Sequence, residues 1–571
     1  MTHRARLHWF GISCLVVASC TQLQDPNQIF GGVDKGGAAA NTAGNADRPV
    51  AGGAGISGSI GDNAGASADT NGGSAPSAGS HTGGSGGDAG APDTDCTDET
   101  GFHGLGCYSC VPKDIITLEN ACTSATCAPF DGKRLALLGA DGKLPALPPP
   151  PSAGGATGAG GAPSSGGAAG AGGAAGTGKA CADVAKNGGT LVYITGSSAA
   201  GPLLTLIAQQ LVSQNIFIVY ESTGSCVGVD AVLNGTPMIT SGPGAPATSA
   251  TYWDSVASPG VACDLPAEGV TADIGASDVF AQSCAGFEFA NLDGVRDAHG
   301  PIQTMTFAVP ANSAYTEISA QAAYFAFGFG ANGGIKDSAG APIWNNEDYL
   351  YKRSASSGTQ VMLAAAIGVP AAAWKGKPQK GSGDVANALI AAAQKQETAN
   401  AALGILAADY IDTKNLRAQL RMLAFQDTNQ HCAVTPDSSV NAKDKANVRD
   451  GHYPVWGPLH LLLRIDAQGN PLNPANRKAV SDIVGYLSGT RALPNGVQLI
   501  DLYAQSGLVP ECAMHVSRTK DGGNIAPYQS PAPCSCLFDK KLGLKPTCSE
   551  CALQADCAAG ETCSLGYCEP N

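Results

Sequence analysis

Two long tracts of small residues limit how much of this chain can fold. Residues 21–94 and 146–180 consist largely of Gly, Ala, Ser, Thr and Pro, and Gly accounts for 76 of the 571 residues. Such tracts carry too little apolar side chain to offset the entropy lost on ordering, so we expect them to be flexible linkers. A folded core is therefore predicted for residues 181–510, a length sufficient for two lobes.

The N-terminus has the pattern of an export signal. A basic start, with Arg4 and Arg6, precedes a short apolar run that ends in Val17-Ala18-Ser19-Cys20. Small residues before a cysteine at this place resemble a bacterial lipobox, in which that cysteine is acylated and becomes the first residue of the mature protein. Residues 1–20 are therefore predicted to be a lipoprotein signal peptide and Cys20 the lipidation site. An ordinary signal peptide or a buried anchor helix is the alternative.

Charge and cysteine content agree with export. The net charge is −14, and no basic stretch follows the signal peptide. This balance argues against nucleic acid as a partner and leaves the lipid anchor as the expected contact with a membrane. Removing Cys14 and Cys20 from the 20 cysteines leaves 18, an even number suited to disulfides. The expected location is the cell envelope, on the periplasmic or the outer-membrane and cell-surface side.

Two cysteine-rich segments flank the core. Residues 95–145 contain five cysteines, so Cys181 just beyond the second linker is a candidate sixth partner. Residues 511–571 end in the spacing C-x2-C-x5-C-x5-C-x4-C, which is similar to that of small disulfide knots in secreted proteins. Zinc is the alternative for the C-x-x-C pair, but the export signal favours disulfides. No metal site is predicted.

The core alternates predicted strands and helices. Residues 191–194 and 216–220 are β-branched and aromatic runs typical of strands, and residues 202–208 between them have the apolar spacing of a helix. This succession predicts an α/β fold with parallel-rich sheets and flanking helices. Ligands of such sheets bind at the loops beyond the carboxyl ends of the strands.

Four loops rich in Gly, Ser and Thr follow one another along the core. They are residues 195–202 (TGSSAAGP), 220–229 (YESTGSCVGV), 273–278 (DIGASD) and 353–359 (RSASSGT). In this order they resemble the loops of the periplasmic phosphate-binding proteins of ABC importers, and the resemblance covers about residues 190–465.

The resemblance implies a hinged, two-lobed periplasmic-binding-protein fold that closes on one anion and delivers it to an importer permease, with no cofactor and no catalytic residue. Residues 303–310 are expected to cross into the second lobe, and the chain is expected to return near residues 400–415.

The loops offer several donors to an oxyanion. Helix N-termini expose unpaired N–H groups at the positive end of the helix dipole. The hydroxyls of Ser225, Ser357 and Thr359 add neutral donors, and Arg353 adds a charged two-pronged donor. The alternatives are a surface salt bridge for Arg353 and helix capping for the hydroxyls. The predicted ligand-binding residues are Ser198, Ser225, Asp278, Arg353, Ser357, Gly358 and Thr359.

Asp278 is the residue that would distinguish between anions. A carboxylate repels an anion unless the anion has a proton to donate, and phosphate has one at neutral pH whereas sulfate does not. The resemblance implies this acceptor role for Asp278. A helix N-cap is the alternative.

The first loop departs from the family's pattern. With Pro202 aligned, the family's ligand-binding Thr falls on Ala200 and its following Phe on Gly201. Ser198 is the candidate replacement for the missing hydroxyl. The predicted ligand is therefore phosphate or a similar tetrahedral oxyanion.

Cys226 lies beside the second loop. We interpret it as a disulfide partner of Cys263, Cys284 or Cys432 rather than as a nucleophile.

The sequence favours a binding protein over two other classes. One alternative is a cell-surface interaction or sensing protein that reuses the binding fold while the cysteine-rich segments recognise a partner. The other is an enzyme such as a phosphatase, which needs a metal cluster or an activated nucleophile. The core histidines have no H-x-H or H-E-x-x-H spacing, and His452 and His460 are interpreted as core or turn residues. We therefore expect no enzymatic activity.

Overall fold

The structure is a computed structural model, and it describes part of the chain. The described residues are 98–99, 107–108, 114–149 apart from Ser124 and Thr126, 179–185, 188–239, 250–284 and 292–570. The predicted signal peptide, Cys20, the first linker and most of the second linker lie outside them. Within the described part, no helix has both the length and the hydrophobicity needed to cross a bilayer.

The described residues form short helices and strands in alternation. The helices are α1 (Ile115–Glu119), α2 (Gly201–Leu211), α3 (Ser225–Leu233), α4 (Ala320–Phe329), α5 (Gly358–Ile367), α6 (Ser382–Ala392), α7 (Gln396–Ala401), α8 (Ala408–Thr413), α9 (Ala446–Arg449), α10 (Arg477–Leu487), α11 (Leu499–Ser506) and α12 (Ser535–Lys541). The strands are β1 (Asp98–Glu99), β2 (Cys107–Tyr108), β3 (Thr190–Gly196), β4 (Ile216–Ser222), β5 (Ala250–Tyr252), β6 (Val261–Cys263), β7 (Ile274–Ser277), β8 (Val295–Pro310), β9 (Glu317–Ser319), β10 (Leu350–Lys352), β11 (Lys377–Pro378), β12 (Leu403–Ala407), β13 (Leu420–Met422), β14 (Ala424–Gln426), β15 (Trp456–Arg464), β16 (Val516–Ser517), β17 (Ala526–Pro527), β18 (Glu561–Ser564) and β19 (Tyr567–Pro570).

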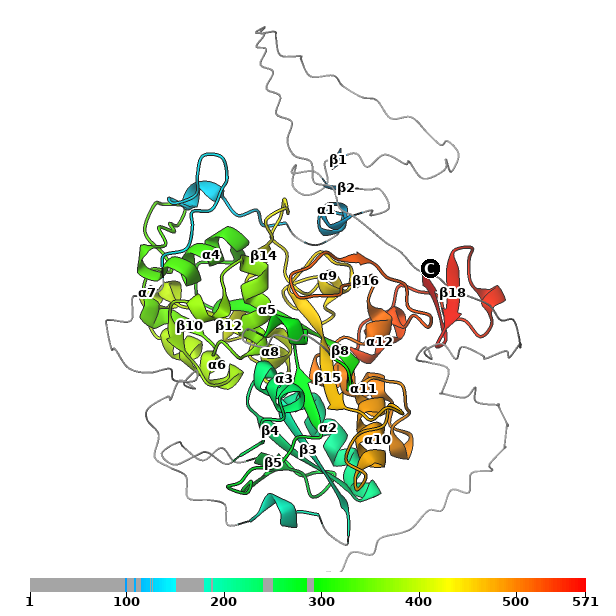
Figure 1. The fold of residues 1–571 in the computed structure, drawn as a ribbon. Helices are drawn as coiled ribbons and strands as arrows, with labels where there is room; N and C mark the ends of the chain where they lie inside the picture. Colours follow the sequence, from blue (N-terminus) through cyan, green and yellow to red (C-terminus); the bar gives the residue numbers. More distant parts are fainter. Residues whose placement is uncertain are drawn as a thin grey trace, which may run out of the picture. The chain divides into compact units, whose positions relative to one another are not determined.

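One long strand, β8, is shared by two lobes. The main sheet has the order β11-β10-β12-β8-β15-β7-β3-β4-β5-β6, with β13 also paired to β8. The first half of β8 pairs with β15 in the first lobe, and its second half pairs with β12 and β13 in the second lobe (Figure 1). The predicted two-lobed α/β fold is confirmed.

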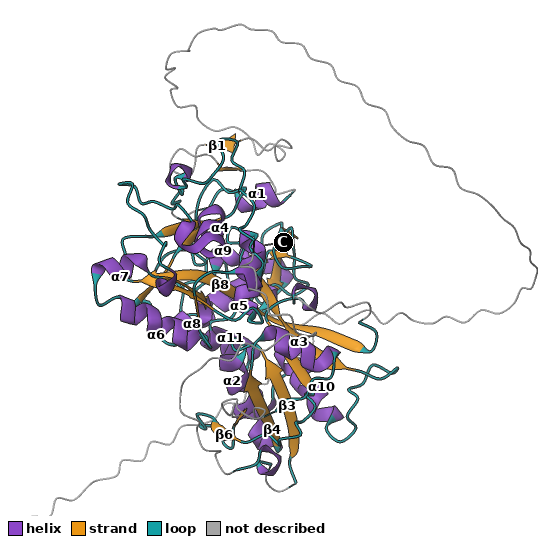
Figure 2. Ribbon diagram, turned by 60° about the vertical axis from the view of Figure 1, so that its left-hand side comes forward, coloured by secondary structure: helices purple, strands orange, loops and turns teal. Residues whose placement is uncertain are grey.

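The first lobe is built on three parallel strands, β3, β4 and β7. β3 pairs in parallel with β4 on one side and with β7 on the other, and the two connections contain α2 and α3. The apolar face of α2 is buried through Leu203, Leu204 and Ile207. Figure 2 shows α2, α3 and α10 beside these strands. Because β3, β4 and β7 run in the same direction, the loops at their carboxyl ends lie at one edge of the sheet.

The second lobe repeats this arrangement around an aromatic core. β10 pairs in parallel with β11 and with β12. The ring of Phe307 on β8 stacks on Phe327 and Phe425 with centroid distances of 5.9 and 5.8 Å. The loops after β10 and β11 therefore lie at the carboxyl edge of this second set of parallel strands, where α5 and α6 begin.

The chain returns to the first lobe later than predicted. The forward crossing lies within β8, as expected, because residues 305–310 pair with second-lobe strands. Residues 403–422, however, still form β12 and β13 against that same half of β8. The chain is back in the first lobe only at Trp456, where β15 begins. The predicted return near residues 400–415 is wrong because the second-lobe sheet is completed by these two strands first.

Eight disulfides lie among the described residues. Cys226 bonds to Cys284, one of its three predicted partners. Cys181 bonds to Cys263, so its assignment to the N-terminal cysteine-rich segment is wrong. The reason is local, since Ala180 forms a β-bridge with Asp264 and brings the two cysteines together. The others are Cys107–Cys122, Cys127–Cys432, Cys512–Cys534, Cys536–Cys548, Cys551–Cys563 and Cys557–Cys568.

The described parts of the cysteine-rich segments are tied to the core to different degrees. Cys127 is linked to Cys432, and Leu135 is buried in the main hydrophobic core. At the C-terminus, Cys534 and Phe538 are buried in the same core, while β18 and β19 form a separate hairpin. Every cysteine of the C-x-x-C run is in a disulfide, which leaves no thiolate there for zinc.

Candidate functional site

Four helices begin where the lobes face one another. α2 and α3 follow the carboxyl ends of β3 and β4, and α5 and α6 follow those of β10 and β11. The loops touch across the lobes: the backbone N–H of Cys226 donates to the carbonyl of Ser356 at 3.0 Å. Helix N-termini that converge in this way provide N–H donors and positive dipole ends. The lobes are therefore in contact at the predicted site.

Asp278 lies at the carboxyl end of β7 and is 2% exposed. The Ser197 hydroxyl donates to its Oδ1, and the Ser225 hydroxyl donates to its Oδ2 at 3.1 Å. Asp278 does not cap a helix, because the next helical turn has Phe280 at its N-cap. The N-cap alternative is wrong. Burial raises the pKa of Asp278 to about 6, although the two hydroxyls and the charge of Arg353 lower it in part.

Arg353 reaches this region from the second lobe. It is 3% exposed, and its guanidinium donates to Ser198 Oγ at 3.3 Å across the lobes, to Ser382 Oγ at 3.3 Å and to the Lys380 carbonyl at 3.0 Å. Its Nε has no hydrogen-bond partner, and no carboxylate among the described residues forms a salt bridge with it. The salt-bridge alternative therefore does not hold. Burial lowers the pKa of Arg353. A buried cation with only neutral partners is poised to bind an anion.

The start of α5 meets the first lobe. Ser357 is its N-cap but makes no side-chain capping hydrogen bond, and Thr359 is 1% exposed. A Cβ on Gly358 would clash with Ser225 Oγ and would lie 2.7 Å from Asp278 Oδ2. Only glycine fits here, because the helix terminus and the Asp278 carboxylate approach each other so closely. The structure thus brings Ser225, Asp278 and Gly358 together.

The first loop uses a serine that sequence reasoning missed. The sequence points to Ser198, which contacts Arg353, but it is Ser197 that bonds Asp278 and accepts the N–H groups of Ala199 and Ala200 at 3.1 and 3.2 Å. The Tyr220 hydroxyl donates to the Ser197 carbonyl. The end of β3 at Gly196 distinguishes the two serines, because Ser197 is the first residue past the carboxyl end of that strand.

A second buried acid also escaped sequence reasoning. Asp409 on α8 is 2% exposed, and both of its carboxylate oxygens lack a hydrogen-bond partner. Burial and the charge of Asp278 raise the pKa of Asp409 well above its usual range. Its sequence context, Ala-Ala-Asp-Tyr, is that of an ordinary helix start, which gave no signal.

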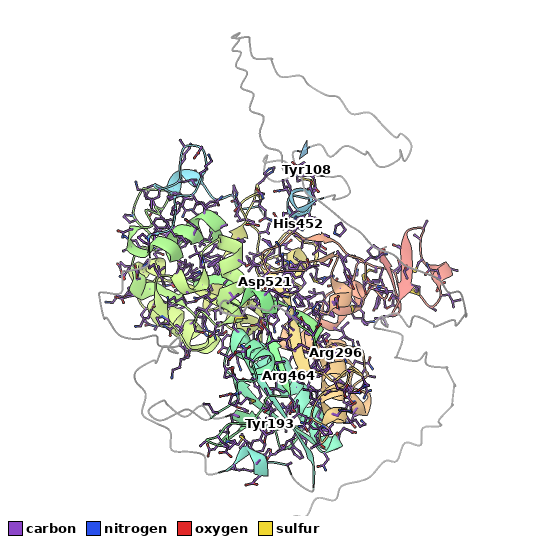
Figure 3. The ribbon with its side chains drawn as sticks, in the orientation of Figure 1. Tyr108, Tyr193, Arg296, His452, Arg464 and Asp521 are labelled. Carbon is purple, nitrogen blue, oxygen red and sulfur yellow. A yellow bond between two sulfur atoms is a disulfide. The ribbon has the colours of Figure 1, made fainter. Side chains whose placement is uncertain are left out.

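The loop after Asp278 is fixed by the C-terminal segment. Asp521, labelled in Figure 3, accepts the Phe280 backbone N–H at 2.9 Å and the Ser283 hydroxyl at 2.6 Å. Cys284, one residue further on, is bonded to Cys226 on α3. The Asp278 loop is therefore held from both sides, as a preorganised site requires.

An open pocket of about 770 Å³ lies elsewhere, at the amino end of β3. Its lining includes Tyr193 and Arg464, both labelled in Figure 3, together with Asp273 and Asn476. None of the predicted ligand-binding residues lines it.

Comparison with known proteins gives structural neighbours only. No family model and no curated protein matches the chain. A phosphate-binding protein from Stenotrophomonas maltophilia is 14% identical over 56% of this chain and 90% of its own, with a TM-score of 0.33. An ABC-type phosphate transport receptor from Vibrio cholerae is 13% identical over 56% of this chain and 100% of its own, with a TM-score of 0.34. The reduced regulatory domain of OxyR from Pseudomonas aeruginosa is 10% identical over 53% and 97%, with a TM-score of 0.28.

Proposed function

We propose that this chain is a binding protein that closes its two lobes on one tetrahedral oxyanion of the phosphate class. The observation that supports it best is the pairing of a buried, unneutralised guanidinium with a buried carboxylate across the lobes. Arg353 lacks a charged partner within salt-bridge distance, and Asp278 has only hydroxyl partners. A ligand that is an anion and a proton donor at once would satisfy both groups.

This pair of groups selects among oxyanions. Monohydrogen phosphate offers oxygens to Arg353 and to the N–H groups at the starts of α3 and α5, and its remaining hydroxyl can donate to Asp278. Sulfate has no proton to offer, so it would leave two negative charges facing each other. Arsenate has the shape and protonation of phosphate and is expected to bind as well.

The proposal includes the context in which the protein works. Eight disulfides among the described residues suit an oxidising compartment outside the cytoplasm. We place the mature chain in the cell envelope, held by a lipid on Cys20, with an ABC importer permease as the recipient of the anion. Catalysis is not part of the proposal, because the described residues around Asp278 include no free thiol and Cys226 is in a disulfide.

A thermal-shift experiment on the full chain tests the proposal. Phosphate and arsenate should raise the melting temperature in a saturable way, because a ligand that binds only the folded state stabilises it. Asp230→Asn, a change at a partly exposed position further along α3 whose side chain bonds Asn234, serves as control and should keep the response. Absence of any response to phosphate, arsenate or another oxyanion would overturn the proposal and leave the surface-interaction alternative.

A further inference from the structure

Three potential metal ligands meet on the first-lobe half of β8 and its neighbour β15. Asp297 Oδ2 lies 2.8 Å from His460 Nδ1 and 3.8 Å from His299 Nε2. One ligand atom from each of the three residues lies within 4.8 Å of the other two. The imidazole rings of His299 and His460 are 4.8 Å apart between centroids.

The β-sheet register explains why these side chains converge. Asp297 and His299 are two residues apart on β8 and so point to the same face, while Arg296, labelled in Figure 3, points to the other. His460 is the direct cross-strand partner of His299. This pairing depends on a register shift: β8 has two residues, Gly300 and Pro301, where β15 has one between Pro458 and His460. Without the extra residue, His460 would face a different position of β8.

The buried member of the group presents one ring nitrogen to it. His460 is 0% exposed, and its Nδ1 is the nitrogen that lies 2.8 Å from Asp297 Oδ2. On the outer side, the side chains of Asp297 and His299 are 28% and 42% exposed, which leaves solvent access to the group.

From this geometry we propose that Asp297, His299 and His460 bind one divalent transition metal ion of the zinc class, with a solvent molecule in the open position. Two imidazoles and one carboxylate are a common set of protein ligands for zinc. With bonds of about 2.0–2.1 Å, ligand atoms in a tetrahedral site are about 3.3 Å apart, and the observed 2.8 and 3.8 Å lie on either side of that value. Small side-chain rotations would close the site.

The surroundings of the group support a structural role for the ion. The ring of Phe280 packs edge-on against His460 and His299, with centroid distances of 4.4 and 6.2 Å. A bound ion would link β8 to β15 beneath the ring of Phe280, which lies two residues after Asp278 in the sequence. The proposal goes beyond the oxyanion site and does not depend on it.

Cobalt titration of the full chain tests this site. The disulfide-bonded protein is freed of metal with a chelator, dialysed into buffer without phosphate and titrated with Co²⁺, whose visible absorption reports tetrahedral coordination. We expect one Co²⁺ per chain and its displacement by Zn²⁺. His299→Ala and Asp297→Asn, at solvent-accessible positions, should each weaken binding at least tenfold.

Two control variants distinguish this site from metal binding elsewhere on the chain. His515→Ala removes a partly exposed histidine that bonds Asp450 at 2.6 Å and does not belong to the Asp297 group, and binding should be unchanged. Arg353→Ala should also leave Co²⁺ binding unchanged, even if oxyanion binding is lost. Absence of saturable binding at one ion per chain, or binding that neither His299→Ala nor Asp297→Asn weakens, would overturn the proposal.

Discussion

At the scale of single residues, the buried carboxyl of Asp278 should make the stability of the protein depend on pH. Its pKa is about 6 in the folded chain against 3.8 ordinarily, because burial favours the neutral carboxyl. The ionised carboxylate of Asp278 therefore destabilises the folded state above pH 6. This destabilisation is lost as the pH falls below the pKa that the carboxyl has in the unfolded chain. The difference amounts to about 3 kcal/mol in the free energy of unfolding.

The measurement is urea denaturation of the ligand-free protein at several values between about pH 7 and pH 4. Other buried acids titrate in this interval, so the comparison with Asp278→Asn isolates the contribution. The wild type should gain more stability than Asp278→Asn on acidification, by about 2 kcal/mol between pH 7 and pH 4. Parallel curves for the two proteins would show that Asp278 is not buried as described.

Substitutions of Arg353 should weaken oxyanion binding to different degrees. Arg353→Ala removes the charge, and we expect a loss on the order of a hundredfold, since removal of one partner of a buried charged contact costs about 2–5 kcal/mol. Arg353→Lys keeps a point charge but loses the planar guanidinium, so its affinity for phosphate should lie between those of the wild type and Arg353→Ala. Phosphate titration followed by intrinsic fluorescence gives the ranking. Equal affinities in all three proteins would remove Arg353 from the site.

Some residues of the candidate site can be predicted from the sequence, and others cannot. Asp278, Arg353 and Gly358 were predicted because their loops resemble those of the phosphate-binding proteins, and the structure places all three where the two lobes meet. Ser197 and Ser198 could not be separated by type, and only the end of β3 at Gly196 decides between them. Asp409 had no signal at all, since its burial results from tertiary packing.

At the scale of elements, the start of α5 must come very close to the first lobe. A methyl group on Gly358 would collide with Ser225 and Asp278, so Gly358→Ala should keep the lobes apart and reduce oxyanion affinity at least tenfold. The fold should persist, because the strands of the two lobes pair with different halves of β8. Circular dichroism and phosphate titration measure the two effects.

Gly381 provides the matched control, as it precedes α6 at the same site. A Cβ there would lie 3.7 Å from its nearest neighbour, Asp384 Oδ2, which is an ordinary contact. Gly381→Ala should therefore bind phosphate as the wild type does. If both variants bind normally, the lobes do not close as the structure indicates.

The succession of strands and helices was accessible from the sequence, but the extent of β8 was not. Runs such as residues 191–194 and 216–220 have an apolar pattern that predicts β3 and β4 directly. The sixteen residues of β8 serve two lobes, and this depends on partners more than 90 residues away. For the same reason the return point at Trp456 could not be read from local pattern.

At the scale of the whole molecule, two disulfides of similar chemistry should have different effects. Cys226–Cys284 joins the start of α3 to the segment after Asp278, whereas Cys127–Cys432 ties the N-terminal segment to the second lobe. Paired replacement by serine should lower stability in both cases, by about 2–4 kcal/mol. Only loss of Cys226–Cys284 should also weaken phosphate binding. Similar losses of affinity in both variants would contradict the inference that Cys226–Cys284 holds the Asp278 loop in position for binding.

The central claim is that one site uses Arg353 to attract an anion and Asp278 to demand a proton from it. Calorimetric titration of the full chain with phosphate and with sulfate at neutral pH tests both parts at once. We predict one phosphate per chain, sulfate at least a hundredfold weaker, and a much smaller difference between the two in Asp278→Asn. Sulfate binding as tightly as phosphate to the wild-type chain, or no binding of either, would contradict the claim.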